Sequence, residues 1–368
     1  MPLHFKRVCR LLFLTILVCC PRAQPSGAQV VDESGGASLS VEVPEVLTGA
    51  HIASVSFAEI VNGKLTITEA FGEQSAGVPA TPSTLYNIAS MTKPISAEVI
   101  LRLVSQGKLS LDDPMYLYWT DPDIASDERR KLLTPRLALS HQTGFPNWRR
   151  ETGGKLSFQR TPGTAYGYSG EGLEYVARFA EKKIGQPFED LAQQLVFGPY
   201  GMTSSAYTRR GWFKGRIAIP NDGDGTWLEP AVADKYSAAD RVYTTPTDYA
   251  RFVIGVMSGQ GLTQNVQADR FTIQVDHAIK PCAGARAVGC PDEIGFGLGW
   301  EIIKVKGKTF LMHTGRDPGL FTLGFFDPVA RTGTIIFTNS EKGAEIILPL
   351  LHLLGADPVF IAYLESQR

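Results

Sequence analysis

The chain has 368 residues, of which 43% are hydrophobic and 20% are charged, a balance typical of a globular protein with a large core. Its 36 basic and 37 acidic residues give a formal net charge of −1. Because no run rich in Lys or Arg follows the first ten residues, the sequence carries no electrostatic footprint for nucleic acid, and it excludes that class of partner.

The N-terminus has the pattern of an export signal. A basic stretch at residues 6–10 precedes the apolar run 11–20, and small residues then offer a cleavage site after Ala28. The run 11–20 is too short to span a bilayer and no later apolar run is long enough, so we expect no transmembrane segment after signal removal. The sequence therefore predicts a signal peptide over residues 1–28 and a periplasmic or secreted protein.

Cysteine use fits an oxidising compartment. Lipidation at Cys19 or Cys20 is an open alternative to cleavage, although the residue before Cys20 is not the small residue that a lipobox requires. Removal of the signal leaves only Cys282 and Cys290, which flank a Gly- and Ala-rich loop and predict a local disulfide. Two unrelated free thiols are the alternative. A metal site is disfavoured because no set of ligands accompanies the pair.

In chain order, the first predicted elements are a leader, a hairpin and a helix. Residues 29–45 are polar and rich in Gly and Ser, which predicts a flexible leader. Residues 51–60 alternate and are rich in β-formers, Asn62-Gly63 is a hairpin turn, and residues 64–71 return as a second strand. Apolar residues then recur at helical spacing over residues 91–106.

Helices and loops dominate the middle of the chain. Residues 172–183 and 188–196 are its best helical stretches, and another helix is expected at residues 247–257. Strand patterns then resume, and a helix closes the chain. These last elements are expected at residues 299–305, 309–313, 322–326, 333–339 and 343–354.

Strands at both ends, with helices between them, predict an α/β fold: one antiparallel sheet, flanking helices and a mostly helical insertion. We expect one domain over residues 46–368. In it, residues 46–110 and 245–368 form the sheet part and residues 111–244 form the insertion. The catalytic cleft is expected between the two parts.

Ser90 and Lys93 are the first candidates for chemistry. At i and i+3 on a helix start, their side chains share one face, so the hydroxyl can lie beside the amine. A serine hydroxyl needs a neighbour that takes its proton, and a desolvated lysine can do that at a helix N-terminus whose N–H groups stabilise negative charge. Ser105 and Lys108 have the same spacing, but Gly107 interrupts the turn there, so we expect Ser105 at the surface.

Several ordered blocks resemble the β-lactamase-related serine hydrolases, a group of class C β-lactamases, DD-peptidases, D-aminopeptidases and related esterases. The resemblance covers roughly residues 46–350 and includes segments similar to the Leu-Ser-His-Thr-Ser-Gly-Leu-Pro, Tyr-Ser-Asn and His-Thr-Gly motifs of that group. Because the blocks follow one another in the order of the family, their combination is highly specific. They are residues 86–94, 107–114, 139–146, 162–169, 245–252, 295–300 and 313–315.

By this resemblance the fold is β-lactamase/transpeptidase-like and the reaction is acyl transfer through an acyl-enzyme at Ser90, without a cofactor or a metal. Tyr168 would relay protons between the Ser90 oxygen and the leaving group. The backbone N–H groups of Ser90 and Arg316 would form the oxyanion hole. The substrate-binding residues implied in this way are His313, Thr314, Gly315 and Arg316.

Two positions depart from the family pattern. Gly170 replaces the Asn of Tyr-Ser-Asn and removes a polar clamp for an acylamide group. His313 stands where β-lactamases have Lys, and a histidine is expected to titrate near neutrality. Both changes favour short esters and D-amino-acid peptides over β-lactams. We therefore expect a nitrophenyl ester to be a better substrate than nitrocefin, and Gly170→Asn to narrow that gap.

The sequence thus predicts an exported serine hydrolase acting on a small-molecule or peptide substrate: a short ester, a D-amino-acid peptide or a peptidoglycan-type peptide. One alternative is an efficient class C-like β-lactamase. A second is a catalytically idle member that binds penicillin or cell-wall peptides as a sensor. A third takes Ser169 as the nucleophile, because residues 167–170 begin like the G-x-S-x-G turn, although Glu171 follows in place of the last glycine.

Overall fold

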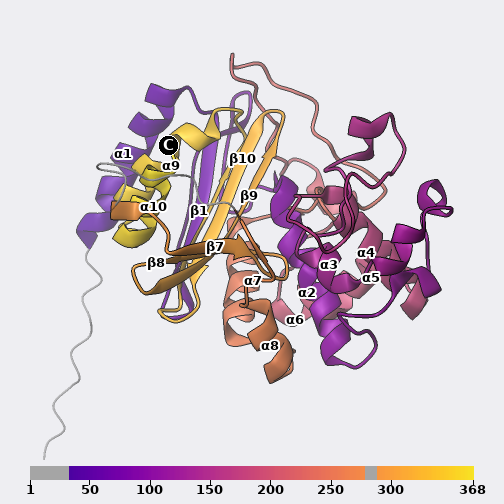
Figure 1. The fold of residues 1–368 in the computed structure, drawn as a ribbon. Helices are drawn as coiled ribbons and strands as arrows, with labels where there is room; N and C mark the ends of the chain where they lie inside the picture. The colour runs from indigo at the N-terminus through magenta and orange to yellow at the C-terminus, as the bar shows by residue number, and fades with distance from the viewer. Residues whose placement is uncertain (1–32, 278–287) are drawn as a thin grey trace, which may run out of the picture.

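The computed structural model describes residues 33–277 and 288–368 (Figure 1). The expected signal peptide at residues 1–28 lies outside the described residues. Cys282 also lies outside them, so the expected bond between Cys282 and Cys290 stays a prediction. Within the described ranges, no helix combines the length and the apolar character needed to cross a membrane.

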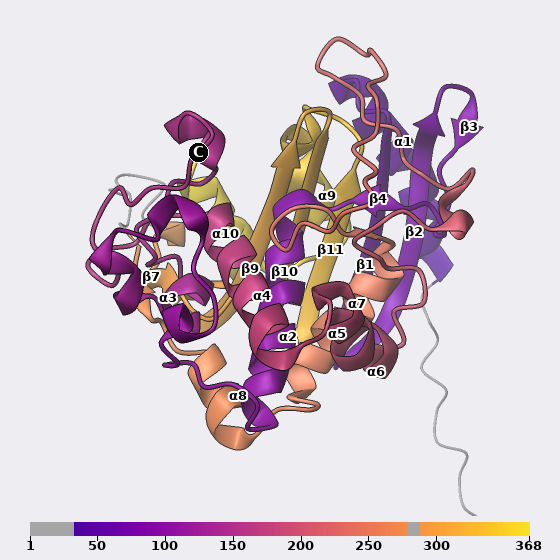
Figure 2. The ribbon, with the colours of Figure 1, turned by 90° about the vertical axis from the view of Figure 1, so that its right-hand side faces the viewer.

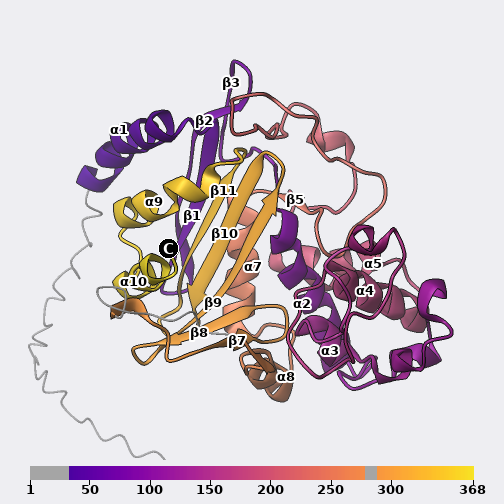
Figure 3. The same cartoon turned by 45° about the horizontal axis from the view of Figure 1, so that its top comes forward.

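A nine-stranded antiparallel sheet forms the centre of the molecule, with the strand order β3-β2-β1-β11-β10-β9-β8-β7-β6 (Figure 3). The first strands of the chain pair with the last one, because β1 lies between β2 and β11, with Val55 opposite Thr338. This confirms the expectation of a sheet built from both ends of the chain. The strands are β1 (Ser54–Val61), β2 (Lys64–Ser75), β3 (Val78–Pro79), β6 (Val275–Asp276), β7 (Glu293–Phe296), β8 (Glu301–Val305), β9 (Lys308–Asp317), β10 (Leu320–Asp327) and β11 (Thr332–Thr338).

Helices cover both faces of this sheet (Figures 1 and 2). The helices α1, α9 and α10 pack on one face, and α2 and α7 pack on the other, with α3 to α6 lying beyond α2. Between residues 112 and 242, where the whole segment is described, the chain forms helices and turns but no named strand. The helices are α1 (Glu33–Ala50), α2 (Thr92–Ser105), α3 (Pro135–Leu139), α4 (Gly170–Ile184), α5 (Phe188–Ala192), α6 (Gly198–Tyr200), α7 (Pro246–Ser258), α8 (Gln264–Arg270), α9 (Ile347–Leu353) and α10 (Pro358–Ser366).

The expectation of a flexible leader over residues 29–45 is wrong for its described part, where α1 begins at Glu33. Val43 and Leu47 of this helix are buried against the sheet and α9, in the same core as Phe57 of β1. The apolar residues of α1 follow a helical spacing, but its Gly, Ser and Pro content gives it the composition of a loop. Burial of the apolar stripe decides its structure, because packing outweighs a weak propensity.

Candidate active site

A strained turn places Ser90 at the start of α2. The chain arrives through the short strand β4 (Tyr86–Asn87) and forms a 3₁₀ turn over Ala89–Met91 before α2 begins. Ala89 has a φ of 44°, a left-handed conformation that costs free energy for a residue with a side chain. The Oδ1 of Asn87 accepts a hydrogen bond from the Ala89 N–H at 3.0 Å and holds this turn.

Lys93 lies one helical turn further on, beside the serine as expected. Its Nζ is 2.8 Å from Ser90 Oγ and 2.9 Å from the carbonyl oxygen of Ala239, and the residue is 1% exposed. Burial lowers the pKa of Lys93 to about 8, although the nearby carboxylates of Asp240, Glu174 and Asp317 act in the opposite direction. A substantial fraction of this amine is therefore neutral in mildly alkaline solution and can accept a proton.

Tyr168 completes a three-residue contact with Ser90 and Lys93. It lies just before α4, its hydroxyl hydrogen-bonds with Ser90, and its ring centroid is 4.8 Å from Lys93 Nζ. Burial raises the pKa of Tyr168 well above the ordinary value. The phenol therefore stays protonated near neutral pH, so it can pass a proton on as a neutral hydroxyl but cannot act as a standing phenolate.

His313 lies on β9, with its ring 6.2 Å from the ring of Tyr168. Burial and the charge of Lys93 lower the pKa of His313 to about 3. The expected titration near neutrality is therefore wrong: the imidazole is neutral, because water is excluded and a cation lies nearby. Its Nδ1 lies 2.7 Å from the carbonyl oxygen of Thr314, and its buried Nε2 has no hydrogen-bond partner among the described residues.

The C-terminal end of β9 has a free edge near Ser90. Its neighbour β8 pairs with β9 only as far as Met312 in the described register, so residues 313–317 pair with β10 alone. The side chains of Thr314 and Arg316 are exposed there. A strand edge with unpaired N–H and C=O groups can take an extended substrate.

Gly315 lets β9 approach the segment that carries the serine. A Cβ on Gly315 would lie 2.2 Å from the carbonyl oxygen of Ile88 and 2.3 Å from Oγ1 of Thr322. Thr322 in turn donates a hydrogen bond to that carbonyl at 3.1 Å. The absence of a side chain at this position therefore serves the close approach of the protein's own chain.

The two alternative serines have structural roles. Ser169 is fully buried and caps α4: its Oγ accepts from the Gly172 N–H at 3.0 Å and donates to the carbonyl oxygen of Pro146 at 2.7 Å. Ser105 ends α2, and its Oγ accepts from the N–H of Thr263. Neither hydroxyl lies beside a lysine amine in the way that Ser90 does.

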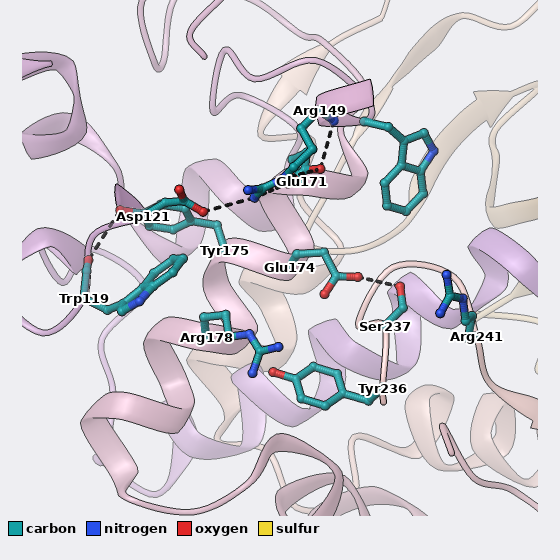
Figure 4. A pocket seen from close by; sticks show the side chains of 11 residues that line it. Trp119, Asp121, Arg149, Glu171, Glu174, Tyr175, Arg178, Tyr236, Ser237 and Arg241 are labelled. Carbon is teal, nitrogen blue, oxygen red and sulfur yellow. Dashed lines mark hydrogen bonds and ion pairs between the residues drawn. The ribbon is translucent and has the colours of Figure 1, made fainter. Parts of the chain in front are cut away.

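Several cavities lie around Tyr168 and α4. One of about 200 Å³ is lined by Tyr168 and His313, and one of about 340 Å³ lies on another side of Tyr168. The third, of about 410 Å³, lies along α4 (Figure 4). Its walls include Trp119, Trp148, Glu171, Glu174, Ser237 and Arg241.

Sequence reasoning found Ser90, Lys93 and Tyr168 but missed the acidic residues around the lysine. Asp240 and Asp317 hydrogen-bond with each other close to Lys93. Burial and the neighbouring carboxyl raise the pKa of Asp240 to about 7. No sequence pattern joins these residues, because they come from a loop and a strand end and meet only in the fold.

Comparison with known proteins finds a carboxypeptidase/endopeptidase, a penicillin-binding protein and an esterase among the proteins similar to this chain. The chain is 22% identical to D-alanyl-D-alanine-carboxypeptidase/endopeptidase AmpH of Escherichia coli (strain K12), over 95% of this chain and 98% of the relative. It is 24% identical to Penicillin-binding protein 4 of Amycolatopsis lactamdurans, over 83% and 86% of the two chains. It is 29% identical to Esterase EstB of Burkholderia gladioli, over only 38% and 42%.

Solved structures share the fold. The octameric penicillin-binding protein homologue from Pyrococcus abyssi superposes with a TM-score of 0.72 at 20% identity, over 88% of this chain and 78% of that one. D-alanine carboxypeptidase AmpC from Burkholderia cenocepacia gives 0.68 at 19% identity, over 88% and 99%. The model of the Beta-lactamase family matches residues 41–354, a range that begins within α1, ends just after α9 and contains Ser90, Lys93 and Tyr168. The chain therefore belongs to the Beta-lactamase family.

Proposed function

We propose that this protein is an exported serine hydrolase that forms an acyl-enzyme at Ser90 and acts on short esters or D-amino-acid peptides. The observation that carries the proposal is the 2.8 Å separation of Lys93 Nζ from Ser90 Oγ, with the Tyr168 hydroxyl bonded to the same serine. A nucleophile, a base and a proton relay thus share one site. Membership of the family supports hydrolase chemistry, and the substrate class and export are part of the proposal.

The reaction begins with proton transfer from Ser90 Oγ to the neutral amine of Lys93 while Oγ attacks the substrate carbonyl carbon. The negative charge on the carbonyl oxygen is stabilised by backbone N–H groups, for which we propose those of Ser90 and Arg316. The proton then passes through the Tyr168 hydroxyl to the leaving oxygen or nitrogen, whose bond to carbon breaks. Water releases the acyl group by the same steps, and its proton returns through the same residues.

The glycine at position 170 favours esters and simple D-amino-acid amides over β-lactams as substrates. Without a side-chain amide at this position, the site lacks one polar clamp for the acylamide group that a β-lactam or a stem peptide carries. A neutral His313 also lacks the fixed charge that would bind a substrate carboxylate. An efficient β-lactamase is the alternative, and it requires a kcat/KM for nitrocefin of about 10⁶ M⁻¹s⁻¹ or more.

Intact-mass analysis after treatment with a fluorophosphonate tests the nucleophile. We expect a single adduct on the mature protein and none on Ser90→Ala, with both proteins folded by circular dichroism. Turnover of a nitrophenyl acetate, a D-alanyl-D-alanine peptide and nitrocefin then identifies the acyl donor. An adduct that persists in Ser90→Ala would refute the proposal, and an adduct without turnover of any substrate would favour the idle sensor.

A further inference from the structure

The loop of residues 237–239 binds Lys93 through the carbonyl oxygen of Ala239, and α4 binds the same loop from its opposite side. Lys93 Nζ donates to the carbonyl oxygen of Ala239 at 2.9 Å, and Ser96 of the same helix donates to the carbonyl oxygen of Ala238 at 2.5 Å. These bonds attach residues 238 and 239 to α2. The position of the Ala239 carbonyl therefore helps to decide where the lysine amine lies relative to Ser90 Oγ.

Glu174 of α4 holds the opposite side of this loop. Its Oε1 accepts from the hydroxyl of Ser237 at 2.5 Å and from the N–H of Ala239 at 3.3 Å. Figure 4 shows the carboxylate pointing across the 410 Å³ cavity toward Ser237. Ala239 thus accepts from the catalytic lysine through its carbonyl and donates to Glu174 through its N–H.

Arg178 of the cavity wall lies close enough to Glu174 for their charges to interact, but its guanidinium is ion-paired elsewhere. Arg149 pairs with Glu171, and Arg178 pairs with Glu181. Among the residues that the structure describes, Glu174 forms no ion pair with a lysine or an arginine. The Ser237 hydroxyl and the Ala239 N–H both bond to Oε1 and would be satisfied equally by the oxygen of a glutamine, so these two bonds do not require a carboxylate.

Lys93, like Arg178, is a cation on which this carboxylate acts, and it is the one that lies beside Ser90. The other charged or titratable groups facing the lysine are the hydrogen-bonded carboxyls of Asp240 and Asp317, the neutral rings of His141 and His313, and the Tyr168 phenol. Glu174 raises the pKa of Lys93 together with the two aspartates, against a larger effect of burial. Burial also raises the pKa of Glu174 itself.

We propose that Glu174 is a positioning residue for catalysis: it fixes the Ala239 carbonyl that holds Lys93, and its charge favours the protonated form of that lysine. This inference rests on the proposed function, in which Lys93 is the base for Ser90. It gives α4 a second role besides placing Tyr168 at its start. Glu174, a residue of the cavity wall, then influences both the position and the protonation of the base Lys93.

The rate of Ser90 labelling by a fluorophosphonate, measured between pH 6 and 10, tests the inference without knowledge of the substrate. In that reaction Ser90 Oγ bonds to phosphorus, fluoride leaves, and Lys93 takes the serine proton. The rate should rise with pH as Lys93 loses its proton. In Glu174→Gln, which keeps the acceptor but removes the charge, the rise should move to lower pH by about 0.5–1 unit.

Two variants of α4 serve as controls. Glu174→Asp keeps the charge and should leave the midpoint of the rise within about 0.2 unit of wild type. Glu181→Gln removes a carboxylate that pairs with Arg178 and should not move the midpoint. Ser237→Ala keeps the charge but removes one donor to Glu174, so it should slow labelling several-fold at every pH without moving the midpoint, and it serves as the second test should Glu174→Gln not fold.

The outcomes separate this inference from the proposed function. Wild-type protein that is not labelled at Ser90 would refute the proposed function. Labelling with an unmoved midpoint in Glu174→Gln would overturn the charge effect of Glu174 alone. Unchanged labelling in Ser237→Ala would overturn its positioning effect, and equal shifts in Glu174→Gln and Glu181→Gln would assign both to the general charge of the helix.

Discussion

The indole of Trp148 occupies the space that any side chain at position 170 would need. A Cβ on Gly170 would lie 2.8 Å from Cη2 of Trp148, closer than such atoms approach in proteins. The Trp148 ring also lies 5.8 Å from Lys93 Nζ and forms part of the cavity wall. The absence of a side chain at position 170 therefore makes room for this indole.

Gly170→Asn alone should consequently fail to restore β-lactam turnover, contrary to the expectation from sequence. The added side chain overpacks against the indole, and we expect the free energy of unfolding to fall by about 1–3 kcal/mol. In Trp148→Ala/Gly170→Asn the clash is removed, so stability should recover in part and the preference for a nitrophenyl ester over nitrocefin should narrow. Urea unfolding and kcat/KM for both substrates measure these effects.

A matched control for this pair is Gly211→Ala, because a Cβ there meets nothing within 4 Å. It should change neither stability nor selectivity appreciably. Equal stability of Gly170→Asn and wild type would show that the indole moves aside without cost, and the account of Trp148 would then be wrong.

The pH dependence of kcat/KM should report Lys93 and not His313. The folded-state pKa of Lys93 is lowered to about 8, so the neutral base accumulates as pH rises through 8, and activity should rise with it. The pKa of His313 is lowered to about 3, so no change from this residue is expected between pH 5 and 8. A transition near pH 6.5 that disappears in His313→Gln would contradict this assignment.

Ser169→Ala should weaken the fold and spare the nucleophile. Loss of the cap of α4 costs about 1 kcal/mol of unfolding free energy, as for other N-cap serines. Labelling of Ser90 by a fluorophosphonate should continue at a similar stoichiometry, which intact-mass analysis measures. Loss of the adduct in a folded Ser169→Ala protein, with retention in Ser90→Ala, would reverse the roles of the two serines.

Glu59 on β1 should make the fold less stable in alkaline solution. Burial raises the pKa of this carboxyl to about 8, its Oε2 accepts from Thr334 at 3.1 Å, and its Oε1 has no partner among the described residues. Because the folded-state pKa is raised, the contribution to stability is complete below pH 4.5 and is lost as pH rises through 8. Glu59→Gln should therefore be more stable than wild type at pH 9, by about 2–4 kcal/mol at most.

The exposed Glu69 on the neighbouring strand provides the control for Glu59. Glu69→Gln should leave the pH dependence of unfolding as it is in wild type. Urea unfolding at pH 5, 7 and 9 compares the three proteins. Parallel stability curves for wild type and Glu59→Gln would mean that the Glu59 carboxyl ionises in the folded protein without cost.

The sequence was informative where chemistry depends on neighbours along the chain. Ser90 and Lys93 are three residues apart, so a helix alone brings them together, and the alternating strands at both chain ends predicted the sheet. It was uninformative where an effect depends on burial. The loss of charge at His313 follows from the exclusion of water around a buried ring. The contact of Glu174 with the lysine-binding loop joins residues that belong to no sequence motif and meet only in the folded chain. The helix α1 was missed because its apolar stripe lies within a loop-like composition.

The pairing of β1 with β11 has a consequence for how the chain folds. Ser54 Oγ donates to Asn339 Oδ1 at 2.7 Å across a sequence separation of 285, so the centre of the sheet joins the early part of the described chain to its late part. During synthesis β1 has β2 as its only neighbour in the sheet until β11 has been made. Contacts between residues so far apart in sequence slow folding much more than they reduce stability, because the closure of a loop costs only about 0.6 kcal/mol more for each doubling of its length. A chain that stops before β11 leaves the apolar strand β1 without its central neighbour, and we expect it to remain unfolded.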